Sequence, residues 1–362
     1  MELIAKTAFP FIVISVGILL AFQGVLMIVA YTVLAERKVL GWIQGRIGPN
    51  RVGPWGVLQP FADLLKFIFK EDIVPDKSTR FVYFLAPMVA LTCALLPIVV
   101  YPFGPSITTV DWSFLPFGLG VGIAALPLTI AKIDVGVLFV LGITSVGVYG
   151  IALAGWSSNN KYSLMGGLRS SAQMISYELA MGASVIGVVM LSGTLDLNGI
   201  IYAQINSPFR WFIIPQFIGF VVFLIAAFAE TNRVPFDLPE AETELVAGFH
   251  TEYSALKFAL FFMAEYVNMF TVSVMCTVLF LGGWYVPGLS HLFDVGSIPY
   301  ALVSHVSFLG KICAFLFLFI WIRGTLPRFR FDQLMNFGWK FLLPVALANV
   351  ILTIVVVFFL NR

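Results

Sequence analysis

The sequence has 362 residues, of which 60% are hydrophobic and only 11% charged, and its formal net charge is +2. Soluble domains carry roughly a quarter charged residues, so the composition excludes an ordinary soluble protein, and the small net charge indicates no nucleic-acid partner. The apolar runs are continuous and about as long as a bilayer-spanning helix, whereas a transmembrane barrel alternates apolar and polar residues. The predicted fold is therefore all-α, a polytopic helical membrane protein whose single integral membrane domain covers residues 1–362.

Eight apolar runs are long enough to be predicted as transmembrane helices. The first ends just before Glu36, Arg37 and Lys38 and has no cleavage site ahead of them, so we expect a retained signal-anchor helix. The eight runs cover approximately residues 9–34, 81–101, 135–155, 172–192, 211–230, 258–284, 302–322 and 341–360.

The distribution of Lys and Arg predicts which connecting segments share a side of the membrane. Segments 36–80, 156–171, 231–257 and 323–340 carry 8, 2, 2 and 4 of the 21 Lys and Arg residues. The positive-inside rule places all four on the cytoplasmic or matrix side, where we expect the function to lie. Because an even number of crossings must separate the first two, the Pro- and Gly-containing run 114–131 is predicted to be re-entrant, interfacial or on the outer face. Eight crossings then put both termini outside.

The first of these segments begins with a turn-rich stretch and continues with an amphipathic helix. Glycines and prolines between Gly45 and Pro54 predict a fixed backbone path that holds Arg46 and Arg51 at the membrane edge. Polar residues then recur at intervals of four, three and four, as expected for one stripe of a helix: Gln59, Asp63, Lys66 and Lys70. Such a helix either shields the bundle or lines a site.

Several ionisable residues lie inside or at the end of apolar runs. Glu178 and Glu265 fall within such runs, and Glu230 ends one. A carboxylate in the bilayer is costly, so each is a functional candidate; the alternative is a carboxylate that hydroxyls or an arginine satisfy purely for packing. Lys311 is either the cationic counterpart of these acids or a side chain that extends to the outer surface.

The segment from Glu230 to Glu244 contains five of the 19 acidic residues and one basic residue, Arg233. Clustered carboxylates repel one another, which favours proton exchange. Glu240 and Glu244 would share one helix face, and Glu242 would point elsewhere. The alternative is a solvated polar loop.

A basic set alternates with aromatic residues near the C-terminus. Its members are either anchors at the inner membrane edge or a docking surface for a protein or an apolar ligand's polar head: Arg323, Arg328 and Arg330, with Asp332. Three histidines and three scattered cysteines indicate neither a disulfide framework nor a metal site. Any redox chemistry must therefore use a bound cofactor or a partner.

The motifs, taken in order, resemble those of the quinone-pocket membrane subunit of respiratory complex I, the H subunit of NADH-quinone oxidoreductase (subunit 1 in mitochondria). The matching stretches are 35–38, 46–54, 58–63, 145–158, 169–178, 230–244, 264–266 and 327–335. Two departures are the longer apolar stretch near 111–131 and Lys132.

The resemblance implies a role in a proton-pumping NADH:quinone oxidoreductase, with no activity for the isolated chain. It implies ubiquinone or menaquinone as the bound substrate, with NAD and iron–sulfur clusters on partner subunits only. The implied partners are peripheral quinone-module subunits, antiporter-like membrane subunits and membrane lipids. The implied location is the bacterial plasma (inner) membrane, in preference to the mitochondrial inner membrane.

The resemblance also assigns residues to three roles. The implied proton path is Glu178, Glu230, Glu240, Glu242, Glu244 and Glu265. The implied quinone chamber and its entrance are formed by Arg46, Asp63, Phe236 and Asp237. The implied partner interface is Arg51, Arg323, Arg328, Arg330 and Asp332.

Two other functions compete with this one. A stand-alone cation or proton antiporter would also use intramembrane carboxylates, but the sequence has no inverted repeat with paired broken helices. The membrane anchor of an energy-converting hydrogenase would lack a quinone pocket, and the intact segment 46–70 argues against it.

Overall fold

A computed structural model describes residues 2–107, 128–238 and 245–360, and every regular element in these ranges is a helix. The α-helices are α1 (Glu2–Ile43), α2 (Gln59–Phe69), α3 (Arg80–Leu95), α4 (Gly136–Ser157), α5 (Lys161–Ser192), α6 (Leu197–Asn206), α7 (Phe217–Glu230), α9 (Ala255–Phe280), α10 (Ile298–Thr325), α11 (Phe331–Phe337) and α12 (Leu343–Leu360). Short 3₁₀ turns are η1 (Pro54–Gly56), η2 (Leu96–Val100), η5 (Gly248–His250) and η6 (Leu289–His291), and a π-helical turn, η7 (Gly338–Leu342), joins α11 to α12.

The helical membrane fold is confirmed. Seven described helices are long and apolar enough to cross a bilayer, and α7 is a shorter apolar helix of 14 residues. At 1.5 Å per residue α7 rises about 21 Å, less than the roughly 30 Å hydrocarbon core, because turns that include Pro215 occupy the start of the predicted run 211–230. Of the predicted outer element, 114–127 lies outside the described residues, and 128–131 is irregular backbone.

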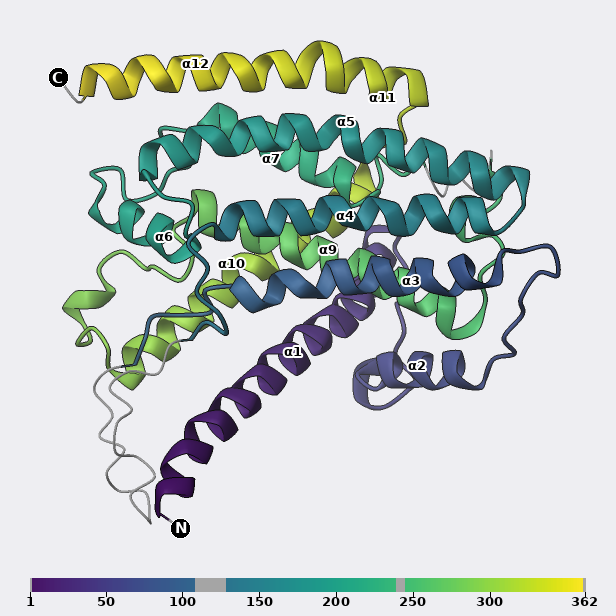
Figure 1. Cartoon of the computed structure of the whole chain (residues 1–362), viewed down its shortest axis with the longest axis horizontal. Coiled ribbons are helices and arrows are strands. Elements are labelled where there is room, and N and C mark those ends of the chain that lie inside the picture. Colours follow the sequence, from purple (N-terminus) through teal and green to yellow (C-terminus); the bar gives the residue numbers. More distant parts are fainter. Residues whose placement is uncertain (1, 108–127, 239–244, 361–362) are drawn as a thin grey trace.

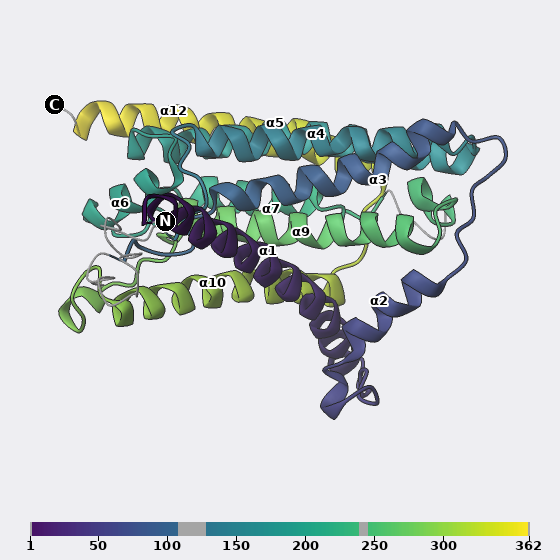
Figure 2. The same cartoon turned by 60° about the horizontal axis from the view of Figure 1, so that its bottom comes forward.

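The helices stack in layers around a buried central helix. In Figure 2, α12, α5 and α4 form the upper layer, α3, α7 and α9 lie below them, α10 lies along the bottom, and α1 runs obliquely across the front. Almost every side chain of α9 from Tyr266 to Phe280 is buried. The side chains that α9 contributes to a site are therefore held inside the bundle.

Small residues allow α3, α4 and α5 to approach closely. A Cβ added to Gly150 of α4 would lie 2.8 Å from the backbone nitrogen and the Cβ of Ala90 in α3. Gly155 of α4 faces Gly167 of α5, where an added Cβ would lie 3.1 Å from the opposite Cα. Close backbone contact between small residues is a common way to pack helices in a bilayer, where no hydrophobic effect drives association.

Helix α5 begins well before the predicted run 172–192. The side chain of Asn160 accepts a hydrogen bond from the backbone N–H of Tyr162 and caps the helix, which then continues to Ser192. The added first turns contain Lys161 and Arg169, so hydropathy alone placed the start of the helix too late. The extension carries α5 to the inner end of the bundle.

Helix α1 crosses the other helices obliquely and is attached mainly through its second half (Figure 1). Leu19 and Leu20 are exposed, whereas Val29, Leu34 and Glu36 are buried. Its attached end therefore delivers Glu36 to the bundle.

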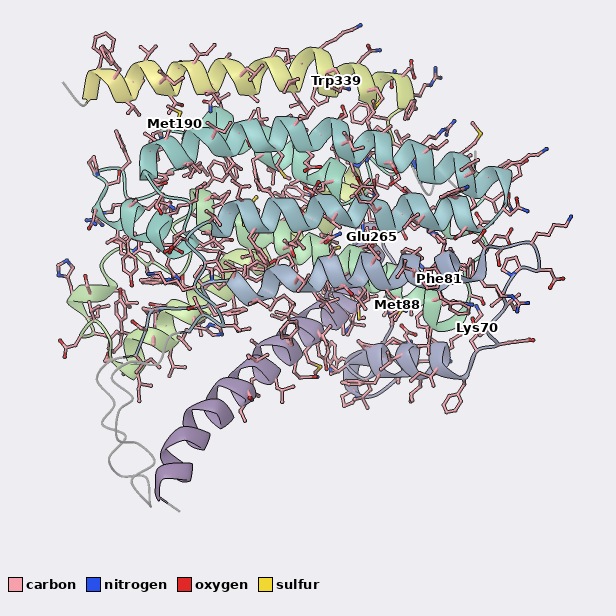
Figure 3. All side chains as sticks on the ribbon, viewed as in Figure 1. Lys70, Phe81, Met88, Met190, Glu265 and Trp339 are labelled. Atoms are coloured by element: carbon pink, nitrogen blue, oxygen red, sulfur yellow. The ribbon has the colours of Figure 1, made fainter. Side chains whose placement is uncertain are left out.

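The four Lys- and Arg-rich segments meet at one end of the bundle. The N–H of Thr79 donates to the carbonyl of Ser157 at 3.1 Å, and ion pairs described below join segment 231–257 to segments 36–80 and 323–340. Both chain termini lie at the opposite end (Figure 1). In Figure 3, Lys70 lies at the edge of the molecule beside α2, whereas Glu265 lies within the bundle.

Candidate functional site

A buried carboxylate, Glu36, organises the inner end of the bundle. It is 5% exposed and accepts a hydrogen bond from the hydroxyl of Tyr266 at 2.7 Å. One guanidinium nitrogen of Arg233 lies 3.3 Å from its Oε1, and Arg323 of α10 pairs with the same oxygen. A single carboxylate thus joins α1, α9, α10 and the segment that follows α7.

Arg233 is shared between Glu36 and Glu265. Its Nε lies 2.5 Å from the Oε1 of Glu265, and its guanidinium carbon stands 4.2 Å from the ring centroid of Tyr266. Burial opposes the charged form of Arg233, but Glu265, Tyr266 and Glu36 together raise its pKa above the usual value. We define these residues as the Glu36 cluster: Glu36, Arg233, Glu265, Tyr266 and Arg323.

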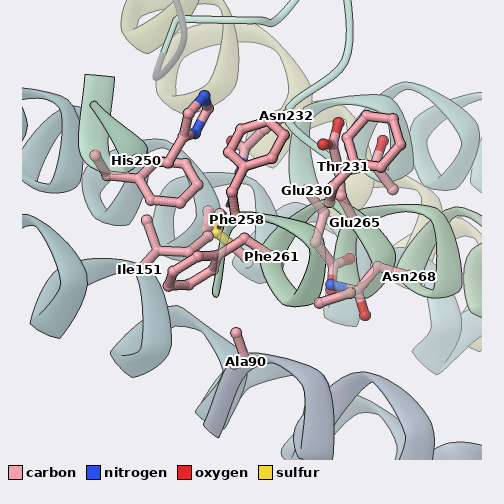
Figure 4. Close-up of a pocket in the computed structure, with 15 residues that line it drawn as sticks. Ala90, Ile151, Glu230, Thr231, Asn232, His250, Phe258, Phe261, Glu265 and Asn268 are labelled. Atoms are coloured by element: carbon pink, nitrogen blue, oxygen red, sulfur yellow. Dashed lines mark hydrogen bonds between the residues drawn. The ribbon is translucent and has the colours of Figure 1, made fainter. Parts of the chain in front are cut away.

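A cavity of about 50 Å³ lies beside this cluster, between α3, α4, α5, α7 and α9. Its polar lining includes Glu230, Thr231, Asn232, Glu265 and Asn268. In the view of Figure 4, the two glutamates and Asn268 gather on one side and His250 lies on the other, with Phe258 and Phe261 between them.

The size and lining of the cavity suit water better than an aromatic ring. Glu230 Oε2 and Asn268 Oδ1 are buried with no hydrogen-bond partner among the described residues, and ordered water commonly satisfies such atoms. A benzene-sized ligand requires roughly 150 Å³. The cavity can therefore hold a few water molecules but not a quinone ring.

The predicted proton-path residues are brought together only in part. Glu178 of α5 is partly buried and close enough to Glu230 to interact with it electrostatically, and Thr144 of α4 is within hydrogen-bonding reach of Glu230. Glu230 and Glu265 line one cavity, which Glu178 does not line. The remaining predicted members lie outside the described residues: Glu240, Glu242 and Glu244.

The start of the acidic segment is held firmly against α5. The side-chain amide of Gln173 donates to the carbonyls of Ala229 and Phe236, both at 2.7 Å. The ring of Phe236 packs against Tyr177 and stacks on Phe329, with centroids 5.7 and 5.5 Å away. Phe236, predicted to line the quinone chamber, is therefore buried at a junction of three segments.

Asp237 and Arg328 form a further ion pair at the inner end, outside the Glu36 cluster, at 2.7 Å. The Asp237 side chain is 8% exposed and that of Arg328 33%. Beyond this pair, Arg330 and Asp332 are exposed at the start of α11. Of the predicted partner-interface residues near the C-terminus, Arg323 and Arg328 thus have partners within the chain.

The remaining predicted entrance residues surround α2. Arg37 donates to Asp63 at 2.8 Å, and Gln59 donates to the other Asp63 oxygen at 2.9 Å. Arg46 is exposed and donates to Gln44 at 2.7 Å, and Arg51 is also exposed. The amphipathic helix is confirmed as α2. None of its residues is fully buried, and Phe67 packs against Phe258 of α9 with ring centroids 6.1 Å apart.

Lys311 was expected either to pair with the buried acids or to extend to the outer surface, and the structure shows a third arrangement. Its ammonium donates to the carbonyls of Leu281, Gly283 and Tyr285 at 2.8–2.9 Å and faces the ring of Trp211. These carbonyls follow the C-terminal end of α9, roughly 24 Å along the helix from Glu265. Lys311 therefore caps the far end of α9 and is not the counterion of Glu265.

Sequence reasoning assigned no role to several residues of the site. Glu36 and Tyr266 stood in recognised motifs, but nothing in the sequence paired them across 230 positions. Gln173 and Asn268 are single amides in apolar helices. A polar side chain inside an apolar run indicates a hydrogen bond between helices, so the sequence did contain a signal for these two residues. His250 could have been noticed as one of only three histidines.

The fold and the site define a polytopic helical membrane protein with a cluster of ion pairs and a polar cavity at one end of its bundle. Comparison with known proteins identifies the family. Residues 16–354 match the family described as NADH dehydrogenase.

Curated relatives cover nearly the whole chain. The H subunit numbered 2 of the Koribacter versatilis NADH-quinone oxidoreductase is 53% identical over 346 residues, 94% of this chain and 96% of the relative. NADH-quinone oxidoreductase subunit 8 of Rhodothermus marinus is 51% identical, covering 92% and 94%. The H subunit of the Leptospira biflexa serovar Patoc enzyme is 51% identical, covering 91% and 90%. The chain belongs to the H subunit family of NADH-quinone oxidoreductase, an oxidoreductase complex, as its motifs indicated.

Proposed function

We propose that this chain forms the quinone entrance and binding chamber of a proton-pumping NADH:quinone oxidoreductase and couples quinone reduction to proton translocation through buried carboxylates. The observation that carries the proposal is the position of Arg233, which pairs with both Glu36 and Glu265 beside a cavity that Glu230 also lines. The names of the relatives supply the reaction.

The coupling follows from the charge balance of the Glu36 cluster. Two carboxylates, Glu36 and Glu265, face two guanidinium groups, so the cluster is neutral as it stands. A proton that binds Glu265 removes one negative charge and leaves Arg233 attracted to Glu36 alone. Because charges interact strongly where water is scarce, the protonation state of Glu265 and the position of Arg233 would change together.

The quinone and the protons would use different spaces. The cavity has room for water and is lined by both Glu230 and Glu265, which suits proton transfer. The quinone would enter along α2, whose apolar side chains are exposed and suit a lipid-soluble substrate: Phe61, Leu64, Leu65, Ile68 and Phe69. Arg46 and Asp63 would flank this entrance, and Phe236 and Asp237 would line the chamber beyond it.

The proton path would run through a series of carboxylates that titrate as a coupled group. Its proposed members are Glu178, Glu230, Glu240, Glu242, Glu244 and Glu265. Charged groups at the inner end would contact partner subunits, and Arg328 would also hold Asp237 in place. The proposed contact residues are Arg51, Arg323, Arg328, Arg330 and Asp332.

The proposed setting is the plasma membrane of a bacterium, in a complex with peripheral subunits and antiporter-like membrane subunits. NAD and iron–sulfur clusters would lie on those partners, and ubiquinone or menaquinone would be the substrate bound here. Membrane lipids would cover the apolar outer surface. The bacterial sources of the relatives support this setting.

The test is the variant Glu265→Gln in native membranes, with Glu71→Gln, an exposed glutamate after α2, as the matched control. NADH:quinone activity should fall by at least about tenfold in Glu265→Gln, while NADH:ferricyanide activity, which does not need the membrane arm, stays normal. The control should keep both rates. Normal quinone reduction with a normal number of protons pumped per electron in Glu265→Gln would refute the proposal.

A further inference from the structure

A second buried cation, Lys257, lies in the first turn of α9, away from the Glu36 cluster. It is 5% exposed, and its ammonium lies 2.8 Å from Asp72 and 3.2 Å from the carbonyl of Ile73. The rings of Tyr83 and Phe84 complete its surroundings, each with its centroid 4.8 Å from the nitrogen. The ammonium is therefore bound from the α2–α3 connection on one side and from α3 on the other.

The position of Lys257 is energetically unfavourable by itself. The N-terminus of a helix carries a partial positive charge, which disfavours a cation in the first turn, and burying an ammonium requires compensation by partners. The backbone of Ala255, two residues earlier, adds strain because its φ of 49° lies in the left-handed region. Asp72, the carbonyl and the two rings offset these costs.

Lys257 fastens a defined strap to α9. We define the α2–α3 strap as residues 70–79, which lead from the end of α2 to the start of α3. Besides the Lys257 contacts, the N–H of Ile73 donates to the hydroxyl of Ser254 at 2.9 Å. The strap thus contacts the start of α9 at three points, through Ser254 and Lys257.

The turn that precedes α9 is itself fixed from other directions. The hydroxyl of Tyr83 donates to the carbonyl of Glu252 at 2.7 Å, and Asn160 donates to the Glu252 carboxylate at 2.5 Å. Tyr253 stacks on Tyr83 with centroids 4.2 Å apart. The strap therefore relates this turn to α2, and the ring of Phe67 in α2, whose centroid lies 6.1 Å from that of Phe258, adds a direct contact with the first turn of α9. Helices α3 and α5 relate the turn to the rest of the bundle.

Helix α9 also leads from Lys257 to the cavity. Phe258, the residue after Lys257, lines the cavity, as do Phe261, Glu265 and Asn268 further along the same helix. Glu265 is two turns and roughly 12 Å from Lys257 along α9. A rigid helix transmits a displacement of its first turn to the side chains over that distance.

We propose that Lys257 is a positioning residue that ties the place of α2 to that of the cavity-lining face of α9. The proposal rests on the proposed function, in which α2 flanks the quinone entrance and Glu265 takes part in proton transfer. Binding of quinone against α2 would then be felt at Glu265 through the strap, Lys257 and α9.

The experiment is a double-mutant cycle in the assembled complex in native membranes. The variants are Lys257→Met, Asp72→Asn and the double variant, with Lys257→Arg as the conservative replacement and Lys77→Met, an exposed lysine of the same strap, as the control. For each, KM for a short-chain quinone and kcat are measured and normalised to NADH:ferricyanide activity, which reports the amount of enzyme.

The expected result is non-additive. Lys257→Met and Asp72→Asn should each raise KM and lower kcat, by about fivefold in kcat/KM, and the double variant should be no worse than Lys257→Met alone. Lys257→Arg should recover at least half of the loss, and Lys77→Met should be normal.

Two outcomes would overturn the proposal. One is a loss of ferricyanide and quinone activity in equal proportion with KM unchanged, which would make Lys257 important for assembly only. The other is additive effects of Asp72 and Lys257. If Glu265→Gln is impaired while Lys257→Met is normal, the positioning role fails but the proposed function stands; a normal Glu265→Gln would remove the proposed function itself.

Discussion

Replacing Tyr266 by Phe isolates one hydrogen bond of the Glu36 cluster. The hydroxyl donates to Glu36 at 2.7 Å, and the two residues are 3% and 5% exposed. A hydrogen bond to a charged group contributes about 1.5–3 kcal/mol, compared with about 0.5–1.5 kcal/mol for a neutral one. The phenyl ring of the variant keeps its packing and its contact with Arg233, so the change removes the hydroxyl alone.

Tyr101→Phe is the matched control. It also removes a buried hydroxyl that makes a hydrogen bond of the same length, but the partner of that hydroxyl is neutral. Tyr101 is fully buried and donates to the hydroxyl of Thr271, also on α9, at 2.7 Å. The difference between the two variants should therefore be about 1–2 kcal/mol. It reports whether the acceptor of Tyr266 is a buried carboxylate.

The assay is the temperature at which the detergent-solubilised complex loses half of its quinone reductase activity. Each kcal/mol corresponds to at most about 2–4 °C for a chain of this size or larger, so Tyr266→Phe should lower the midpoint by a few degrees more than Tyr101→Phe. An equal or smaller shift for Tyr266→Phe would refute the reasoning, because Glu36 would then not be a desolvated, charged acceptor.

Three further predictions concern the segments around the site. Gly166→Ala should destabilise the complex, because the new Cβ would lie 2.7 Å from the backbone of residues 248–249. Gly182→Ala on the same helix meets nothing within 4 Å and should be neutral or slightly stabilising. The thermal inactivation midpoints of the two variants are compared. Burial lowers the pKa of His250 to about 4, below the ordinary value near 6.5, so the unfolded chain binds the extra proton first and stability should fall as the pH drops from about 6.5 to about 4; a His250→Asn variant with the same pH dependence would contradict this. Arg328→Gln and Asp237→Asn should be non-additive by about 0.5–3 kcal/mol, as measured by thermal inactivation of single and double variants; additive effects would mean that the 2.7 Å pair does not form.

Hydropathy predicted the membrane fold because the bilayer imposes a length that the sequence displays directly. The eight apolar runs and the polar stripe of α2 each depend on local spacing. The start of α5 was predicted too late for the same reason: residues 161–171 are helical but polar, and hydropathy reports burial in lipid, not helix. Local sequence patterns therefore predict spans and helix faces, but not how far a helix continues beyond the bilayer.

The contacts of the site depend on distances in the chain that no local pattern spans. Glu36 meets Arg233 and Arg323 across 197 and 287 residues. The sequence offered each of them as a charged group near a membrane edge, without its partner. Lys257 looked like an ordinary inner-face lysine because burial of a single cation is decided by the aromatic rings of α3, which are remote in sequence.

The attachment of α1 also has a consequence for synthesis in the membrane. Leu19 and Leu20 of α1 are exposed, and its inner end is fastened by arginines that are made long after it. During translation Glu36 is therefore made before any of the partners named above. Arg233 and Tyr266 follow it, and the Glu36 cluster is complete only once Arg323 of α10 has been made. Truncated chains that end before residue 233 lack all three partners of Glu36 and should expose the inner end of α1 to proteases, whereas chains that end between α9 and α10 should protect it in part.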